Sequence, residues 1–181
     1  MHIPVLLNEV IELLDPKPNE NFIDGTFGRG GHSKLLLEKI APEGIVIGLD
    51  LDLESLESFK RENQGNISER LILEHLNFAQ VGQAKGLARA GKIDGILFDL
   101  GMSSWHIDDS AKGFSFSKDE PLDMRYDSAN PVSAAEIVNN LTPESLQEIF
   151  ENLKFGNCFG FRTFGFRTLL NAYSCFTERS N

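Results

Sequence analysis

The chain has 181 residues, of which 41% are hydrophobic and 24% are charged, and its formal net charge at pH 7 is −10. This balance is ordinary for one globular domain with a proper core, and no stretch is long and apolar enough to span a membrane. The start of the chain has no basic region followed by a long apolar run, which argues against secretion, so we expect a cytoplasmic protein.

The cysteines and histidines do not form a metal-binding pattern. Both cysteines, Cys158 and Cys175, lie in the last 31 residues without a partner at metal-ligand spacing, and they indicate only a reducing compartment. His32 and His106 are isolated from other ligand types. We therefore expect no metal site.

Apolar periodicity predicts alternating helices and strands along the first 100 residues. A helix is expected over 4–14, ended by the Asp-Pro-Lys-Pro run at 15–18. Four residues at helical spacing are predicted to form its buried face: Leu6, Val10, Leu13 and Leu14. Strands are then expected at 21–24, at 45–49, from 71 and at 93–98, and helices at 33–40, 53–61 and 79–90. This alternation predicts an α/β fold with a parallel sheet, which binds ligands at the carboxyl ends of its strands.

The most informative stretch runs from Asn21 to Ser33, where an apolar strand leads into a glycine-rich turn and then a helix. The turn contains four glycines: Gly25, Gly28, Gly30 and Gly31. Glycine lets the backbone adopt positive φ and approach a ligand closely, and a helix start offers unpaired N–H groups. The pattern predicts a cradle for a nucleotide-like cofactor.

An acidic residue at the end of the second predicted strand supports this interpretation. Asp50 follows the apolar run 44–49, where a carboxylate accepts hydrogen bonds from ribose hydroxyls. Ser33 stands where the dinucleotide fingerprint has its third glycine. The loop therefore favours S-adenosylmethionine, which has ribose and adenine but no phosphate, over a dinucleotide.

The character of the chain changes after residue 100. The stretch 100–130 is a long polar loop that also carries large apolar side chains, and a loop of this length is more often functional than idle. Helices are expected at 131–139 and 143–152, the second capped by Thr142 with Pro143 at its first position.

Several motifs occur in the order that characterises one family. They are His2–Leu7, Asp24–Ser33, Gly48–Asp52, Asn77–Phe78, Phe98–Ser104, Gly113–Phe116 and Pro121–Arg125. In residues 2–150 the chain thereby resembles the RsmH/MraW family, S-adenosylmethionine-dependent methyltransferases that act on N4 of a cytosine in the decoding region of small-subunit (16S) ribosomal RNA. The resemblance implies a Rossmann-like methyltransferase core over 1–105 and the start of an inserted helical substrate-recognition domain over 106–150.

The resemblance also implies a set of cofactor contacts. Carried over residue by residue, they are Gly30, Gly31, His32, Asp50, Phe78, Asp99 and His106. The glycines and His32 match the loop around the methionine portion, Asp50 the ribose ligand and Phe78 the aromatic residue against adenine. His106 stands where the family has a glutamine.

Three further positions are assigned to the substrate side, and one to catalysis. Asp99, at the end of the fourth predicted strand, is expected to hold the amine, with capping of the next turn as the alternative. Trp105 is the only tryptophan and is expected to stack on a flipped cytosine or to anchor the loop. Asp123 and Arg125 are expected near the RNA, with a plain ion pair as the alternative.

The net charge of the chain bears on whether its substrate is naked RNA or an assembled ribosomal subunit. Residues 1–150 carry 13 Lys and Arg against 25 Asp and Glu, a net charge of −12. Binding to RNA phosphates depends on clustered Lys and Arg. We therefore expect poor binding of naked RNA and a preformed small ribosomal subunit as the partner.

The segment 151–181 departs from the family pattern. It holds six of the 14 phenylalanines and a repeated Gly-Phe-Arg-Thr at 160–163 and 165–168. We interpret it as a frame-shifted or mispredicted end; a lineage-specific ending and an aromatic, basic strip that touches RNA are the alternatives. Because only four strand candidates precede it, we expect a truncated sheet and little or no turnover.

Two other functions stay open at this stage. One is a non-catalytic S-adenosylmethionine-binding remnant, and the other is an NAD-dependent oxidoreductase. Ser33 at the third glycine position and the turn from Asp99 to Ser104 argue against the oxidoreductase. The sequence does not indicate an oligomeric state.

Overall fold

The computed structural model describes residues 4, 6–102, 104–108 and 110–152. The chain forms two compact units that divide after Asn139, and each is considered by itself. The atypical tail predicted at 151–181 lies outside the described residues, apart from 151 and 152 at the end of a helix. The domain boundaries at 105 and 150 stay predictions.

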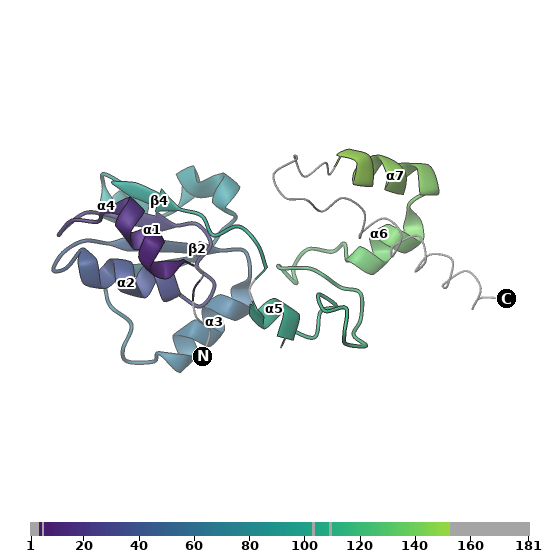
Figure 1. Cartoon of the computed structure of the whole chain (residues 1–181), viewed down its shortest axis with the longest axis horizontal. Helices are drawn as coiled ribbons and strands as arrows, with labels where there is room; N and C mark the ends of the chain where they lie inside the picture. The colour runs from purple at the N-terminus through teal and green to yellow at the C-terminus, as the bar shows by residue number, and fades with distance from the viewer. Residues whose placement is uncertain (1–3, 5, 103, 109, 153–181) are drawn as a thin grey trace. The chain divides into compact units, whose positions relative to one another are not determined.

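The first unit contains a parallel sheet of four strands, as the alternating pattern predicted (Figure 1). The strands are β1 Phe22–Asp24, β2 Val46–Asp50, β3 Leu71–His75 and β4 Gly95–Leu97, in the spatial order β3-β2-β1-β4. Ile23 on β1 is paired with Ile47 on β2 and with Ile96 on β4. In the described sheet β4 is an edge strand, and Ile96 is 44% exposed there. The fold is the Rossmann-like α/β arrangement expected from the sequence.

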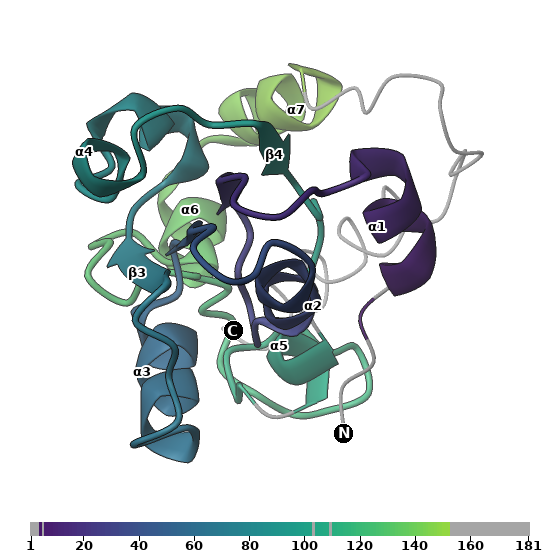
Figure 2. The same cartoon turned by 90° about the vertical axis from the view of Figure 1, so that its left-hand side faces the viewer.

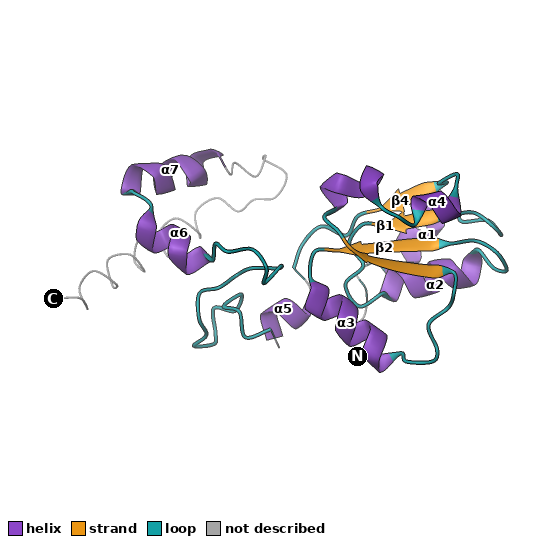
Figure 3. Ribbon diagram, turned by 180° about the vertical axis from the view of Figure 1, so that it is seen from behind, coloured by secondary structure: helices purple, strands orange, loops and turns teal. Residues whose placement is uncertain are grey.

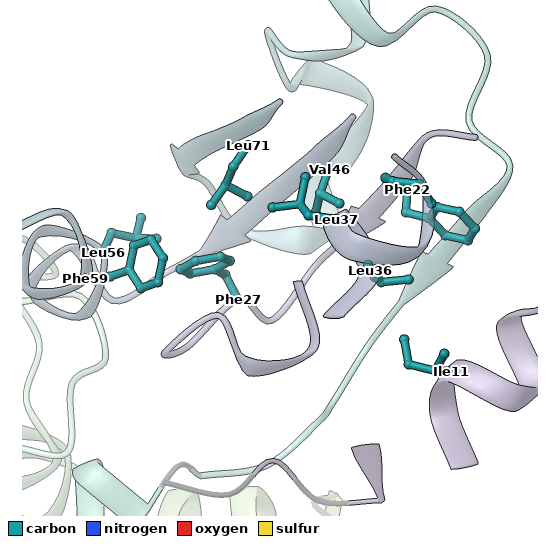
Figure 4. Close-up of a cluster of buried hydrophobic side chains, with 10 residues drawn as sticks. Ile11, Phe22, Phe27, Leu36, Leu37, Val46, Leu56, Phe59 and Leu71 are labelled. Atoms are coloured by element: carbon teal, nitrogen blue, oxygen red, sulfur yellow. The ribbon is translucent and has the colours of Figure 1, made fainter. Parts of the chain in front are cut away.

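Three helices cover one face of the sheet. They are α1 Leu7–Leu14, α2 Gly31–Lys39 and α3 Leu53–Glu62, and Figure 3 shows α2 and α3 on the same side of the strands. Their inward side chains pack with one residue from each of β1, β2 and β3 in a single apolar cluster (Figure 4). Its members are Ile11, Phe22, Phe27, Leu36, Leu37, Ile40, Val46, Leu56, Phe59 and Leu71. Leu56 and Phe59 are the two apolar side chains that α3 buries in this cluster.

The buried face predicted for α1 is correct only in part, since Leu14 packs against the core as expected. Leu13 is 87% exposed and Leu6 is 62% exposed, whereas Ile11 is buried. The helix lies beside α2 (Figure 2), and this contact turns Ile11 and Leu14, one turn apart, toward the core. Periodicity alone could not select this stripe because apolar residues occur on more than one side of the helix.

The opposite face is covered by two short helices, not by the single helix predicted at 79–90. They are the 3-10 helix η1 Phe78–Gln83 and α4 Leu87–Ala90. Between them, the Glu74 carboxylate accepts hydrogen bonds from the N–H groups of Lys85 (2.9 Å) and Gly86 (2.6 Å). This side chain on β3 takes backbone donors that a continuous helix would use itself, so the predicted helix is interrupted. A second cluster of buried residues on this side of the sheet is formed by Ile23, Ile47, Leu49 and Ala84.

Three helices follow the sheet. The predicted loop at 100–130 contains α5 Ser104–Asp108, and α6 Ala134–Asn140 and α7 Pro143–Asn152 come after it. Ser133 and Glu136 form a capping box that starts α6, since the Glu136 carboxylate accepts from the Ser133 N–H at 2.7 Å. The predicted cap of α7 is confirmed, because Thr142 Oγ1 accepts from the Ser145 N–H at 3.3 Å.

Within the described ranges, no helix combines the length and the apolar character that crossing a membrane requires.

Candidate functional site

The glycine loop lies at the carboxyl edge of the sheet and is fixed from both sides. The Gly28 N–H donates to Asp50 Oδ2 at 2.6 Å, and the Gly28 carbonyl accepts from Ser55 Oγ at 3.0 Å. Gly28 has a φ of 53° and Gly30 a φ of 70°, conformations that favour glycine. The loop therefore has one defined path between β1 and α2.

Phe27 anchors this loop in the core. Its side chain is 3% exposed and meets Phe59 edge-on, with ring centroids 4.8 Å apart. Its carbonyl accepts from the Gly30 N–H at 2.8 Å. A Cβ at Gly30 would lie 2.6 Å from the ring and one at Gly48 2.5 Å from it. Glycine at both positions makes room for this ring.

Asp50 ends β2 and is half-buried beside the loop. Burial raises the pKa of its carboxyl group, while hydrogen bonds from the N–H groups of Asp52 and Gly28 oppose that change. A carboxylate oxygen has two lone pairs, so Asp50 can hold the loop and still accept from a hydroxyl. The ribose contact of Asp50 stays a prediction.

A second carboxyl group at this edge, Asp24, was not among the residues singled out from the sequence. It ends β1, is 1% exposed, and accepts from Ser33 Oγ at 2.6 Å and from the Thr26 N–H at 3.2 Å. Burial raises its pKa to about 6, against the hydrogen bonds from Ser33 and Thr26. Its place in the Asp-Gly-Thr-Phe-Gly motif was the signal available.

The three loop residues predicted to contact the cofactor lie together at the start of α2. Gly30 is the N-terminal cap of the helix, in a left-handed conformation, and Gly31 and His32 form its first residues. His32 is 7% exposed. A Cβ at Gly31 would lie 2.1 Å from Pro4 Cγ, so the segment before α1 passes directly against this helix start.

Phe78 and Asp99 lie at the same edge and are exposed. The Phe78 ring is 42% exposed and meets Phe98 at a centroid distance of 5.4 Å. The Asp99 N–H donates to Thr26 Oγ1 at 2.7 Å, which ties the end of β4 to the glycine loop. An aromatic face and a carboxylate are thus both open to a ligand here.

His106 has a different environment. It is 6% exposed, and its Nε2 lies 3.1 Å from Asp52 Oδ2. Trp105, Phe114 and Tyr126 surround the imidazole, with centroid distances of 5.2, 5.3 and 4.6 Å. The expected cofactor contact of His106 stays a prediction, and its partner Asp52 was not among the predicted site residues.

Asp123 and Arg125 form the ion pair that was the alternative to direct RNA contact. Arg125 donates through Nε at 2.7 Å and through a terminal nitrogen at 2.8 Å to the two Asp123 oxygens. This guanidinium lowers the pKa of the Asp123 carboxyl group to about 2. Each of the two side chains is 26% exposed, and their contact with RNA stays a prediction.

The residues at the carboxyl edge fit an adenosyl cofactor. Gly28 is uncrowded, since a Cβ there would meet only the Thr26 carbonyl oxygen, at 3.9 Å. Asp50 offers a hydroxyl acceptor, Phe78 an exposed ring and Asp99 an exposed carboxylate. No group of three or more His, Cys, Asp or Glu side chains that could hold a metal ion occurs in the described part of the chain.

Comparison with known proteins identifies similar sequences. Residues 1–158 match the MraW methylase family. The chain is 46% identical over 149 residues to the ribosomal RNA small subunit methyltransferase H of Syntrophotalea carbinolica, covering 82% of this chain and 47% of that protein. For the protein of the same name from Heliobacterium mobile, the identity is 44% over 153 residues, covering 84% and 48%. The chain thus spans about half the length of the curated relatives it matches.

Similarity to solved structures is weaker. A SAM-dependent O-methyltransferase from Thermotoga maritima is 17% identical, with a TM-score of 0.39 over 44% of this chain and 31% of its own. The family assignment therefore depends on the sequence matches.

Proposed function

Since the chain belongs to the MraW methylase family, we propose that it carries the cofactor-binding half of an S-adenosylmethionine-dependent methyltransferase of small-subunit ribosomal RNA. The observation that carries the proposal is the hydrogen bond from the Gly28 N–H to the Asp50 carboxylate, at the carboxyl end of β2. In it, a side chain that can accept from a hydroxyl lies beside an uncrowded glycine loop. The family membership argues against the NAD-dependent oxidoreductase.

The proposed cofactor contacts divide by chemistry. Asp50 accepts from the ribose hydroxyls, Phe78 packs against the adenine, and Gly30, Gly31 and His32 border the methionine portion. Hydrogen bonds to a charged carboxylate are among the stronger ones in proteins. The buried anchor Phe27 keeps the loop in one conformation, so little entropy is lost on binding.

The proposed reaction is methylation of the N4 amine of a cytosine in the decoding region of 16S ribosomal RNA. When bound, the cofactor would supply a sulfonium methyl group and leave as S-adenosylhomocysteine. The C–S bond would break as the C–N bond to the amine forms, and the amine proton would pass to solvent. Asp99, exposed at the end of β4, is proposed to accept a hydrogen bond from the amine and so to orient its lone pair. Trp105, Asp123 and Arg125 are proposed on the RNA side.

Asp50→Ala tests the cofactor site. We expect the affinity for S-adenosylmethionine to fall by the ~1.5 to 3 kcal/mol typical of a hydrogen bond to a charged group, because the ribose acceptor is lost. Isothermal titration calorimetry measures the change. Thermal unfolding of the same variant checks that the chain still folds, and Glu57→Ala, at an exposed position of α3, is the control. An unchanged affinity would remove Asp50 from the site.

The acidic surface leads to a prediction about the substrate. A full-length family member carrying this half should methylate assembled small subunits much faster than protein-free 16S RNA. The net charge of −12 over residues 1–150 disfavours contact with naked phosphates. Methyl transfer from labelled cofactor to each substrate measures the difference, and equal rates would contradict the charge argument. Applied to the 181-residue chain itself, the same assay separates an enzyme from a binding remnant.

A further inference from the structure

Residues 104–126, of which 109 is not described, form a segment that docks on the N-terminal end of α3. Its internal hydrogen bonds are local. Ser110 Oγ donates to the His106 carbonyl at 2.6 Å, and the Met124 N–H donates to the Lys112 carbonyl at 2.8 Å. The Asp123 carbonyl accepts from the Ala134 N–H at 2.9 Å, so the segment is also joined to the start of α6. This segment contains all three residues proposed above on the RNA side: Trp105, Asp123 and Arg125.

The contact with α3 depends on both oxygens of one carboxylate. Asp52 Oδ1 caps the helix by accepting from the N–H groups of Glu54 (3.1 Å) and Ser55 (3.3 Å). Asp52 Oδ2 faces His106 Nε2 at 3.1 Å, across 54 residues of sequence. Capping needs only one oxygen, and Ser or Asn would serve equally well. The second oxygen therefore has a separate task.

Charge and burial strengthen this contact. Asp52 is 1% exposed and His106 is 6% exposed, so water competes little for their hydrogen bond. Burial alone would raise the pKa of Asp52, but the hydrogen bonds from His106 and Ser55 and the nearby positive charge of Lys112 outweigh it, and the pKa is lowered. Lys112 Nζ is itself buried, 3.8 Å from Glu54 Oε2. Two basic side chains of the segment thus face two acidic side chains at the start of α3.

We propose that Asp52 is a positioning residue that holds the 104–126 segment, and the Asp123–Arg125 pair within it, through the buried imidazole of His106. Tyr126, directly after Arg125, packs on that imidazole at 4.6 Å, which links the hydrogen bond to the RNA-side pair. The proposal rests on the proposed function only where it assigns this segment to RNA. The docking itself is independent of any ligand.

Matched variants of the full chain separate positioning from general stability. Asp52→Ser keeps a helix cap but has no second oxygen for His106. His106→Phe keeps an aromatic ring among Trp105, Phe114 and Tyr126 but has no nitrogen. His106→Gln keeps an N–H donor that can reach Asp52 and is the conservative rescue.

Hydrogen exchange measured by mass spectrometry, with the emission of Trp105 as the only tryptophan, reports docking directly. In Asp52→Ser and His106→Phe, we expect amide exchange within 110–126 to accelerate on the order of tenfold to hundredfold, and the emission to shift to the red. The amides of β1 and β2 should exchange as in the wild type, and His106→Gln should resemble the wild type. Wild-type exchange in both disruptive variants, an equal acceleration in the sheet, or failure of His106→Gln to rescue would each overturn the proposal.

Two binding measurements keep the two proposals apart. Sedimentation with small ribosomal subunits should show weaker binding for Asp52→Ser and His106→Phe than for the wild type. Calorimetry of the wild type with S-adenosylhomocysteine tests the proposed function alone. Failure of the wild type to bind either ligand would count against the proposed function, while the exchange data would still decide whether Asp52 holds the segment.

Discussion

Between about pH 3 and pH 7, the free energy of unfolding of the wild-type chain is expected to fall by roughly 3 kcal/mol relative to that of Asp24→Asn. The Asp24 carboxyl group has a pKa of about 6 in the fold and 3.8 ordinarily, and each pKa unit corresponds to about 1.36 kcal/mol. Because the folded pKa is the higher one, the contribution is fully present below pH 3.8 and is lost as the pH rises through 6. Asparagine does not ionise and lacks this dependence.

Urea unfolding of both proteins at several pH values measures this difference. Asparagine can keep both local hydrogen bonds, accepting from the Thr26 N–H and donating to Ser33 Oγ, so its fold should be retained. Ser33→Ala is the companion variant. It removes a donor that lowers the pKa of Asp24, and should therefore extend the loss to higher pH. Parallel pH profiles for the wild type and Asp24→Asn would show that this carboxyl group is not buried in the fold.

Phe27→Ala is expected to destabilise the fold by about 3 to 5 kcal/mol, the usual range for removing a buried phenylalanine. The ring lies between Phe59 and the glycines at 30 and 48, and its loss leaves a cavity under the cofactor loop. Affinity for S-adenosylmethionine should fall with it, since the loop is no longer fixed. Chemical unfolding and calorimetry measure the two effects.

Phe98→Ala is the matched control for Phe27→Ala. Its ring is 43% exposed at the same edge of the sheet, so its removal should cost much less stability. Phe27→Leu should give an intermediate loss because part of the volume is kept. If Phe27→Ala and Phe98→Ala unfold at the same urea concentration, the anchoring role of Phe27 is wrong.

Local patterns predicted those parts of the molecule that local interactions determine. The strands β1 and β2, the glycine loop and Asp50 are close in sequence, and their apolar runs and glycines have few alternative structures. The cap at Thr142 was predictable for the same reason. The division of η1 from α4 was not, because it depends on Glu74 reaching across from β3.

The polar side chains of the site show more clearly that local sequence patterns do not predict contacts between distant residues. Asp52 reads in sequence as an ordinary helix cap, and nothing local indicates that its second oxygen meets His106. Asp24 reads as a strand-end carboxylate, and its burial follows only from packing of the loop and α2 above it. Tertiary contacts of this kind, between residues 9 to 54 positions apart, leave no periodic signal in the sequence.

The position of the four strands along the chain affects the order of events during synthesis. All pairings of the described sheet lie within residues 22–97, so these four strands can pair with one another once Leu97 has been made. At ~5 to 20 residues per second, every further ~20 residues add roughly 1 to 4 s. While synthesis continues, the unpaired side of β4, with Ile96 beside it, is accessible on the nascent chain. An open strand edge of this kind is where chaperones and neighbouring nascent chains would compete.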